Sequence, residues 1–167
     1  VASTKAFTSQ VILLNMIAIW FAQQKNINYQ LRIKYIADLH NLHHDIKKCI
    51  QYSLEQIPLV LPLFNYPSCF LLGKNSGEAV AREGALKIKE ISYIHAEGYS
   101  SSSLKHGPFA LLTDKFPVVM ISPEDEYSTK NENAYQEIQS RQANIIFITD
   151  KQIPSSEKKN VISIPRN

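Results

Sequence analysis

The chain has 167 residues, enough for one ordinary domain or for one domain and part of another. Hydrophobic residues make up 44% and charged residues 20%, a composition that supports a packed core and argues against disorder. The net charge of +3 is small, and lysines and glutamates are interspersed without a basic stripe, so we expect no nucleic-acid partner.

Residues 4–24 are predicted to form one helix, which the hydroxyl of Ser3 or Thr4 could cap. No charge occurs between Lys5 and Lys25, so a membrane span has to be considered. Polar residues interrupt the stretch, however, and leave no apolar run of about 18 residues. We therefore expect no membrane segment, but a core helix that is apolar on nearly all sides and needs neighbours on most of them.

Residues 29–57 are predicted to form an amphipathic helix or helix pair. Leu31, Tyr35, Leu39 and Leu42 begin an apolar series at helical spacing, while lysines and aspartates occupy the opposite side. Because a proline inside a helix removes a hydrogen bond and clashes with the preceding turn, we expect Pro58 and Pro62 to end this region.

The histidines and cysteines do not form a metal-binding pattern. His40 and His44 have the spacing of an H-E-x-x-H zinc motif, but Asn41 stands where its glutamate would be. The two cysteines, Cys49 and Cys69, lack C-x-x-C spacing and lie among apolar residues. We predict no metal site, and free thiols in a reducing compartment.

Short apolar runs alternate with helical segments after Pro67. The expected strands are 69–72, 116–122, 144–149 and 161–164, and the expected helices are 78–93 and 127–143. Pro117 is acceptable as the first residue of a strand. Such an alternation indicates a buried parallel sheet with helices on both faces.

Two loops carry candidate anion or hydroxyl contacts. Residues 73–77, GKNSG, connect a strand to a helix, and a tight turn with a serine cap and a phosphate-binding loop are equally compatible with them. The serines at 100–103 favour a cap on a short helix, with an oxyanion or sugar-hydroxyl contact as the alternative.

One helix face combines two carboxylates and an amine. Glu83, Lys87 and Glu90 fall at i, i+4 and i+7, which by spacing alone favours a surface ladder of ion pairs. The same helix also carries apolar residues and leads into a segment with His95, Glu97 and a Lys105–Pro108 turn. Carboxylate, amine and imidazole together are suited to moving protons beside a carbonyl, so residues 83–108 are predicted to be an active-site segment.

Three sequence blocks resemble a known family. EGALKIKEISYIHAE followed by LKHGP resembles the isomerase half of the glucosamine-6-phosphate synthases, the glutamine–fructose-6-phosphate transaminases (isomerizing), and VASTKAFTSQ resembles the end of the first of their two sugar isomerase (SIS) lobes. The resemblance implies an α/β fold of the SIS type, a three-layer α/β/α sandwich with a parallel sheet, preceded by a helical segment from a truncated first lobe. By this reading residues 1–27 are a remnant of lobe one, residues 28–60 a helical connector, and residues 61–167 a second lobe that is incomplete at its C-terminus.

The resemblance also implies an activity. The family makes glucosamine 6-phosphate from fructose 6-phosphate and glutamine, using ammonia released by a glutaminase domain of the same polypeptide that this chain does not include. The isomerase half opens the sugar, forms an imine at C2 and moves a proton between C1 and C2. We accordingly expect a cytoplasmic homodimer without a cofactor.

Site residues follow from the matching positions. Glu90 would be the base that moves the proton, and Lys87 would assist that transfer. His106 would assist ring opening from the neighbouring subunit. Val1, by its backbone, and Ser3 would contact the sugar.

The sequence departs from the family pattern at two places. Ser102 and Ser103 replace a usual Gly-Glu pair, which removes an acidic residue that could orient Lys105 or His106. The loop after the first strand reads GKN in place of Gly-Arg-Gly. The Ser/Thr-rich phosphate loop of lobe one and a C-terminal sugar-binding lysine also lie outside this chain, so we expect these 167 residues alone to be inactive.

Two other functions remain open. One is a related two-lobe SIS enzyme such as a fructosamine-phosphate deglycase, and the other is an SIS module that senses a sugar phosphate without catalysis. Glu90 with Lys87 and His106 favours catalysis, because a sensor needs no groups for proton transfer.

Overall fold

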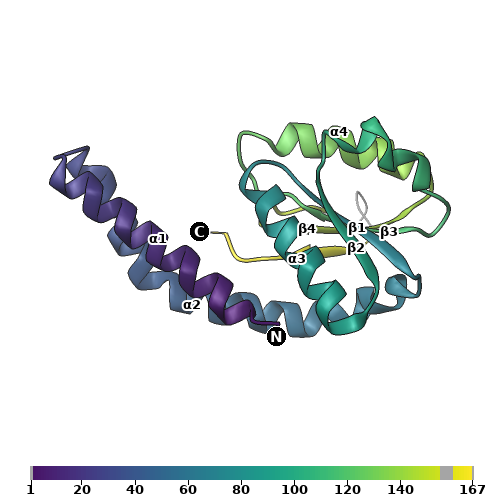
Figure 1. Cartoon of the computed structure of the whole chain (residues 1–167), viewed down its shortest axis with the longest axis horizontal. Coiled ribbons are helices and arrows are strands. Elements are labelled where there is room, and N and C mark those ends of the chain that lie inside the picture. The colour runs from purple at the N-terminus through teal and green to yellow at the C-terminus, as the bar shows by residue number, and fades with distance from the viewer. Residues whose placement is uncertain (1, 155–159, 167) are drawn as a thin grey trace. The chain divides into compact units, whose positions relative to one another are not determined.

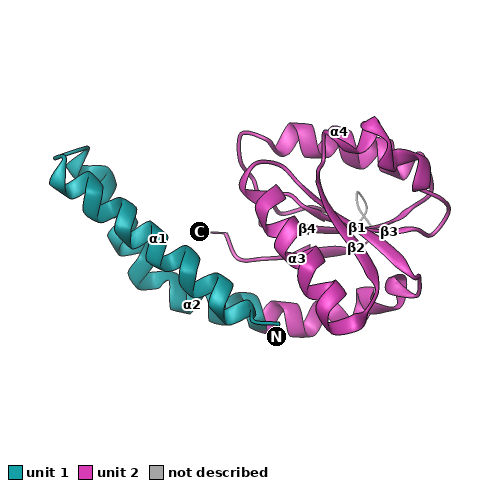
Figure 2. Ribbon diagram, viewed as in Figure 1, with its two compact units in different colours: residues 1–50, 167 teal, residues 51–166 magenta. Residues whose placement is uncertain are grey.

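The computed structural model describes residues 2–154 and 160–166. The chain divides into two compact units, one reaching to Ile50 and the other running from Gln51 to Arg166 (Figure 2).

The first unit contains α1 (Thr4–Gln24) and most of α2 (Tyr29–Val60). The helix expected at 4–24 is confirmed, and it is the helix whose length and mean hydropathy, 1.4, would suit a membrane span. Ser3 occupies the N-cap position but makes no side-chain capping bond, so that prediction was wrong. Within this chain α1 buries none of its residues, although core helices of soluble proteins share its composition.

Helix α2 continues through the first of the two prolines that were expected to end it. It includes Pro58 and ends at Val60, and a 3-10 helix, η1 (Leu61–Phe64), follows with Pro62 in its first turn. The proline removes the hydrogen bond to the carbonyl of Leu54. Leu54 is exposed, so water can hydrate that carbonyl and the helix need not stop.

A five-stranded parallel sheet forms the centre of the second unit (Figure 1). Its strands are β1 (Ser68–Gly73), β2 (His95–Ser100), β3 (Pro117–Ile121), β4 (Asn144–Thr149) and β5 (Val161–Ser163), in the order β2-β1-β3-β4-β5. The four expected strands are confirmed, with Pro117 at the first position of β3. The order reverses between β1 and β3, which in an open α/β sheet is where a ligand crevice forms.

The sheet is covered on both faces, as the three-layer α/β/α prediction requires. Helix α3 (Ser76–Ser92) packs on one face and α4 (Ser128–Gln139) on the other. Side chains alternate along β1, so that Phe70 and Leu72 join the core under α4 while Cys69 and Leu71 join the core under α3. Two 3-10 helices, η2 (Leu104–His106) and η3 (Pro108–Leu111), follow β2.

Strand β2 was missed by the sequence analysis. It lies at an edge of the sheet and carries polar side chains, so it lacks the apolar run that marks a central strand. Its glycine has a structural reason: a Cβ at Gly98 would lie 2.5 Å from the Cα of Arg82 in α3. The helix therefore packs directly against the backbone of this strand.

Candidate active site

The structure brings Glu83, Lys87 and Glu90 together on the surface of α3. The Lys87 Nζ lies 2.6 Å from Glu90 Oε2 and 3.5 Å from Glu83 Oε1. The Lys87 side chain is only 17% exposed, so most of its length is covered by neighbouring residues. This stripe matches the spacing that the sequence predicted.

Electrostatics favour the charged form of Lys87. The pKa of Lys87 is raised, chiefly by its hydrogen bond to Glu90, with a smaller contribution from Glu83 and an opposing one from desolvation. Lys87 therefore remains an ammonium at neutral pH. The ammonium is hydrogen-bonded to Glu90 Oε2, so it holds that oxygen in one place, and a positioned carboxyl group is a candidate general base.

His106 does not join this stripe within the chain. It lies in η2, where its neighbour Leu104 is buried in the core under α4, whereas α3 contributes Ala81 and Ala85 to the core on the other face. The sheet thus separates the His106 turn from the α3 carboxylates. His106 is exposed, and Gly107 follows it with a φ of 140° that only glycine adopts readily.

The two predicted sugar contacts at the start of the chain belong to the first unit. Ser3 directly precedes α1 and is exposed. Val1 lies outside the described residues. Their proposed contacts with a sugar therefore stay predictions.

Serines follow β2 but do not cap the next helix. Ser103 stands at the N-cap of η2 without a side-chain capping bond, so the expected serine cap was wrong. Instead, Lys74 Nζ donates to the Oγ of Ser102 at 2.8 Å and to the Oγ of Ser100 at 3.3 Å. The amine of the β1–α3 turn is thereby tied to the end of β2.

The β1–α3 turn contains an unusual backbone conformation. Asn75 is the N-cap of α3, with φ 52° and ψ −116°, and again makes no side-chain capping bond, so the serine cap that was one of the two alternatives for this loop is absent. A glycine adopts these angles without strain. Gly73 is needed for space, because a Cβ there would lie 2.2 Å from the backbone of Gly77.

An acidic partner for the His106 turn comes from a part of the chain that sequence reasoning did not consider. Lys105 Nζ lies 2.6 Å from Glu137 Oε1 on α4. The expectation that Lys105 has no acidic partner, drawn from the serines at 102 and 103, is therefore wrong. No local signal could have revealed the pair, because its members are 32 positions apart.

The edge strand carries a second set of polar contacts. Ser68 Oγ and His95 Nδ1 are 3.2 Å apart, His95 Nε2 lies 3.5 Å from Glu97 Oε1, and the Tyr99 hydroxyl donates to Glu97 Oε2. The last hydrogen bond, together with burial and the charge of Glu97, raises the pKa of Tyr99 to about 12. Sequence reasoning placed His95 and Glu97 in the active-site segment, and the structure places them on the edge strand rather than on α3.

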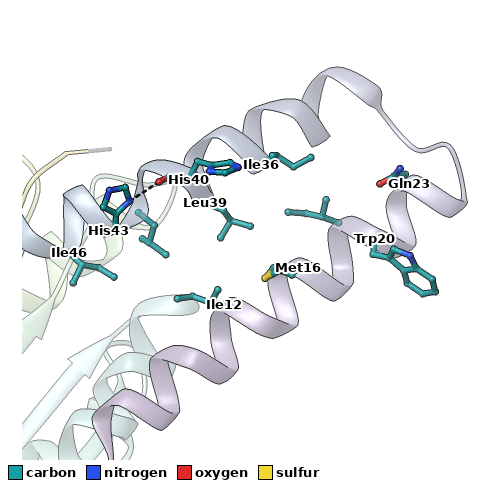
Figure 3. A pocket seen from close by; sticks show the side chains of 11 residues that line it. Ile12, Met16, Trp20, Gln23, Ile36, Leu39, His40, His43 and Ile46 are labelled. Atoms are coloured by element: carbon teal, nitrogen blue, oxygen red, sulfur yellow. Dashed lines mark hydrogen bonds between the residues drawn. The ribbon is translucent and has the colours of Figure 1, made fainter.

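The first unit contains an apolar groove of about 480 Å³ (Figure 3). Side chains of α1 and α2 line it, among them Met16, Trp20 and Leu39. His40 and His43 stand at its rim, where His43 Nδ1 lies 2.8 Å from the His40 carbonyl oxygen. Among residues 2–154 and 160–166, no three metal-ligating side chains come together.

Comparison with known proteins identifies the fold family. Residues 63–165, more than half of the chain, match the family model described as the SIS domain. The chain therefore belongs to the SIS domain family.

Within that family the chain is similar to particular enzymes. A probable glutamine--fructose-6-phosphate aminotransferase [isomerizing] from Acanthamoeba polyphaga mimivirus is 52% identical over 92% of this chain and 25% of its own length. The enzyme of that name from Rhizobium meliloti (strain 1021) is 36% identical over 95% of this chain and 26% of its own length. The chain thus spans about a quarter of the length of these relatives.

A solved structure gives the same match. The C-terminal domain of glucosamine-fructose-6-phosphate aminotransferase from Francisella tularensis superposes with a TM-score of 0.91 and 34% identity, over 99% of this chain and 48% of that chain. The counterpart covers the helical segment as well as the sheet.

Proposed function

We propose that this chain is part of the isomerase region of a glutamine–fructose-6-phosphate aminotransferase (isomerizing), which makes glucosamine 6-phosphate from fructose 6-phosphate and glutamine. The observation that carries the proposal is the Lys87–Glu90 pair on α3, with Lys87 Nζ 2.6 Å from Glu90 Oε2, in a chain 52% identical to a probable enzyme of that name. A module that only senses a sugar phosphate needs no carboxyl group and amine held together for proton transfer.

Glu90 is the group that moves the proton. Once the sugar carbonyl at C2 has become an imine, the hydrogen on C1 is acidic, and the Glu90 carboxylate removes it. Returning that proton to C2, while the hydroxyl on C1 gives up its proton and the imine nitrogen gains one, leaves an aldehyde at C1 and an amine at C2 and completes the isomerisation. Lys87 holds the Glu90 oxygen in place during the transfer, because the pair is hydrogen-bonded.

His106 assists ring opening in the active site of a partner subunit. An imidazole titrates near neutral pH, so it can both accept and donate the proton of the ring hydroxyl. Its position on the face of the sheet opposite to α3 supports this arrangement, since His106 and Glu90 of one chain are separated by the sheet. The enzyme is accordingly a homodimer with shared sites.

The helical part belongs to the first lobe and its connector. Residues 1–27 form the end of lobe one, with Val1 and Ser3 contacting the sugar, and residues 28–60 lead to the second lobe. Helix α1 then packs against the rest of lobe one and not in a membrane. The Francisella match over 99% of this chain, described as an aminotransferase domain, supports this reading of an apolar helix that is unburied here.

The remaining partners follow from the same proposal. A glutaminase domain of the same polypeptide supplies ammonia, and the reaction uses neither a cofactor nor a nucleic acid. A cytoplasmic location suits the free cysteines Cys49 and Cys69. Burial raises the pKa of Cys69 to about 11, so this thiol is unreactive.

The test is an assay of the full-length protein with fructose 6-phosphate and glutamine. We expect glucosamine 6-phosphate to form, and a polypeptide of these 167 residues alone to form none. Release of free sugar phosphate from a fructosamine phosphate, without amination, would identify a deglycase instead. Tight sugar-phosphate binding without any turnover would identify a sensor.

A further inference from the structure

Besides the contacts with the β1–α3 turn, three contacts hold the turn that carries His106 on the α4 side of the sheet. Leu104 is 2% exposed and lies in the core under α4. Ser101 Oγ donates to Asn131 Oδ1 at 2.7 Å, and both of these residues are buried. The third contact is the ion pair between Lys105 and Glu137.

These contacts hold different parts of the turn. The buried contacts of Leu104 and Ser101 fix the beginning of the turn. The Lys105–Glu137 pair is the contact adjacent to His106, and Lys105 is the residue directly before the imidazole. Its distance of 2.6 Å is that of a strong charge-assisted bond.

We propose that Glu137 on α4 is a positioning residue for His106, acting through the Lys105 ammonium. The inference rests on the proposed function, in which His106 assists ring opening. It adds a residue outside the 83–108 segment and explains how this chain manages with Ser102 and Ser103 where the family usually has Gly-Glu. The carboxylate that holds the turn comes from α4 and not from the turn itself.

The exposure of the pair makes the inference testable. The side chains of Lys105 and Glu137 are 60% and 37% exposed, and exposed ion pairs contribute little to folding stability. Removing the carboxylate should therefore leave the fold intact. A change in turnover would then report the placement of His106 and not unfolding.

The experiment compares three variants of the full-length protein. Glu137→Gln removes the charge, and Glu55→Gln makes the same chemical change on the exposed surface of α2 as a matched control. The third variant adds Ser103→Glu to Glu137→Gln and so restores a carboxylate at the position of the family pattern. For each variant kcat and KM for fructose 6-phosphate are measured, together with deuterium uptake by residues 101–107.

We expect Glu137→Gln to lower kcat about tenfold, because a displaced catalytic group loses much of its effect, with KM changed by less than about twofold. Adding Ser103→Glu should restore most of kcat. Deuterium uptake by residues 101–107 should rise in Glu137→Gln and fall back to the wild-type level in the double variant. The inference is wrong if Glu137→Gln has the same kcat as Glu55→Gln. It is also wrong if Ser103→Glu does not restore the kcat that Glu137→Gln has lost.

Failure of the proposed function would give a different result. If the full-length wild-type protein does not convert fructose 6-phosphate, the proposed function falls, and the positioning role falls with it. If the wild type is active and Glu137→Gln is as well, only the further inference is wrong. Unchanged deuterium uptake in Glu137→Gln overturns the anchoring of the turn in either case.

Discussion

The two faces of the sheet in the second unit are packed by different means. Under α3 the core contains the small residues Ala81, Ala85 and Ala96, and the helix touches the backbone of β2 at Gly98. Under α4 the core is rich in aromatic side chains, and the segment from residue 101 to residue 116 packs there as well. Figure 1 shows α3 and α4 in the two helical layers on either side of the sheet.

This difference separates two kinds of functional residue. The α3 face presents Lys87 and Glu90 on one helix that has no room to move toward the sheet. The α4 face presents His106 on a turn fixed by a few side-chain contacts. Helix-on-sheet packing thus supports the proposed base, and side-chain contacts to α4 support the turn of the proposed ring-opening residue.

The largest expected effect is on the α3 face. In the full-length protein Glu90→Gln should lower kcat about a thousandfold, because an amide cannot accept the proton that a general base removes. Glutamine keeps the shape of the side chain and can still accept a hydrogen bond from Lys87, so binding of the sugar phosphate should change little. A steady-state assay with a binding titration checks this prediction, and an unchanged kcat would remove Glu90 from the role of base.

On the α4 face we expect the largest loss of folding stability when a buried aromatic side chain is removed. Phe70 is 1% exposed and contacts the rings of Tyr99 and Phe116. We expect Phe70→Ala to lower the free energy of unfolding by about 3–5 kcal/mol, because a large cavity remains. Denaturant midpoints, followed by hydrogen exchange in β1 and β3, measure it. A cost below about 1 kcal/mol would mean that this core is loosely packed.

On the α3 face we expect a loss of folding stability when a Cβ atom is added to a glycine of β2. Gly98→Ala should destabilise the protein by about 1–3 kcal/mol, since the new Cβ would lie 2.5 Å from the Cα of Arg82 and must displace α3. Gly84→Ala is the matched control, because its Cβ would meet only the flexible end of Leu71, at 2.9 Å. Equal costs for the two alanines, read from the same denaturant midpoints, would contradict close packing of α3 on β2.

The smallest effect is expected at the start of α3, and it should be a gain. Asn75→Gly should raise the free energy of unfolding by about 0.5–1 kcal/mol, because glycine adopts φ 52° and ψ −116° without strain. Part of this gain in folding stability is offset by the greater conformational entropy of glycine in the unfolded chain. Thermal unfolding scans detect such a shift. A lower midpoint would show that the asparagine side chain stabilises the turn.

Much of the fold could be predicted because its signals are local. Strands β1, β3 and β4 are continuous apolar runs, and α3 shows helical spacing. Strand β2 was not predicted, because this edge strand carries His95 and Glu97 and has no apolar run. The end of α2 was misplaced because the cost of Pro58 depends on whether the freed carbonyl reaches water, and the sequence does not show that.

The candidate site divides in the same way. The Lys87–Glu90 pair follows from spacing on one helix, so it was predictable. The partner of Lys105 was not, because Glu137 reaches it only after α4 has packed on the sheet. The separation of His106 from Glu90 also depends on which face each segment covers, and this is a property of the folded sheet.

The most direct test of the account mixes subunits of the full-length protein. Glu90→Gln and His106→Asn should each be nearly inactive alone. If each active site takes Glu90 from one chain and His106 from its partner, a mixed dimer regains one intact site, and an equal mixture should recover about a quarter of wild-type activity. No recovery after verified subunit exchange would contradict the shared site, because it would mean that both residues serve the same subunit.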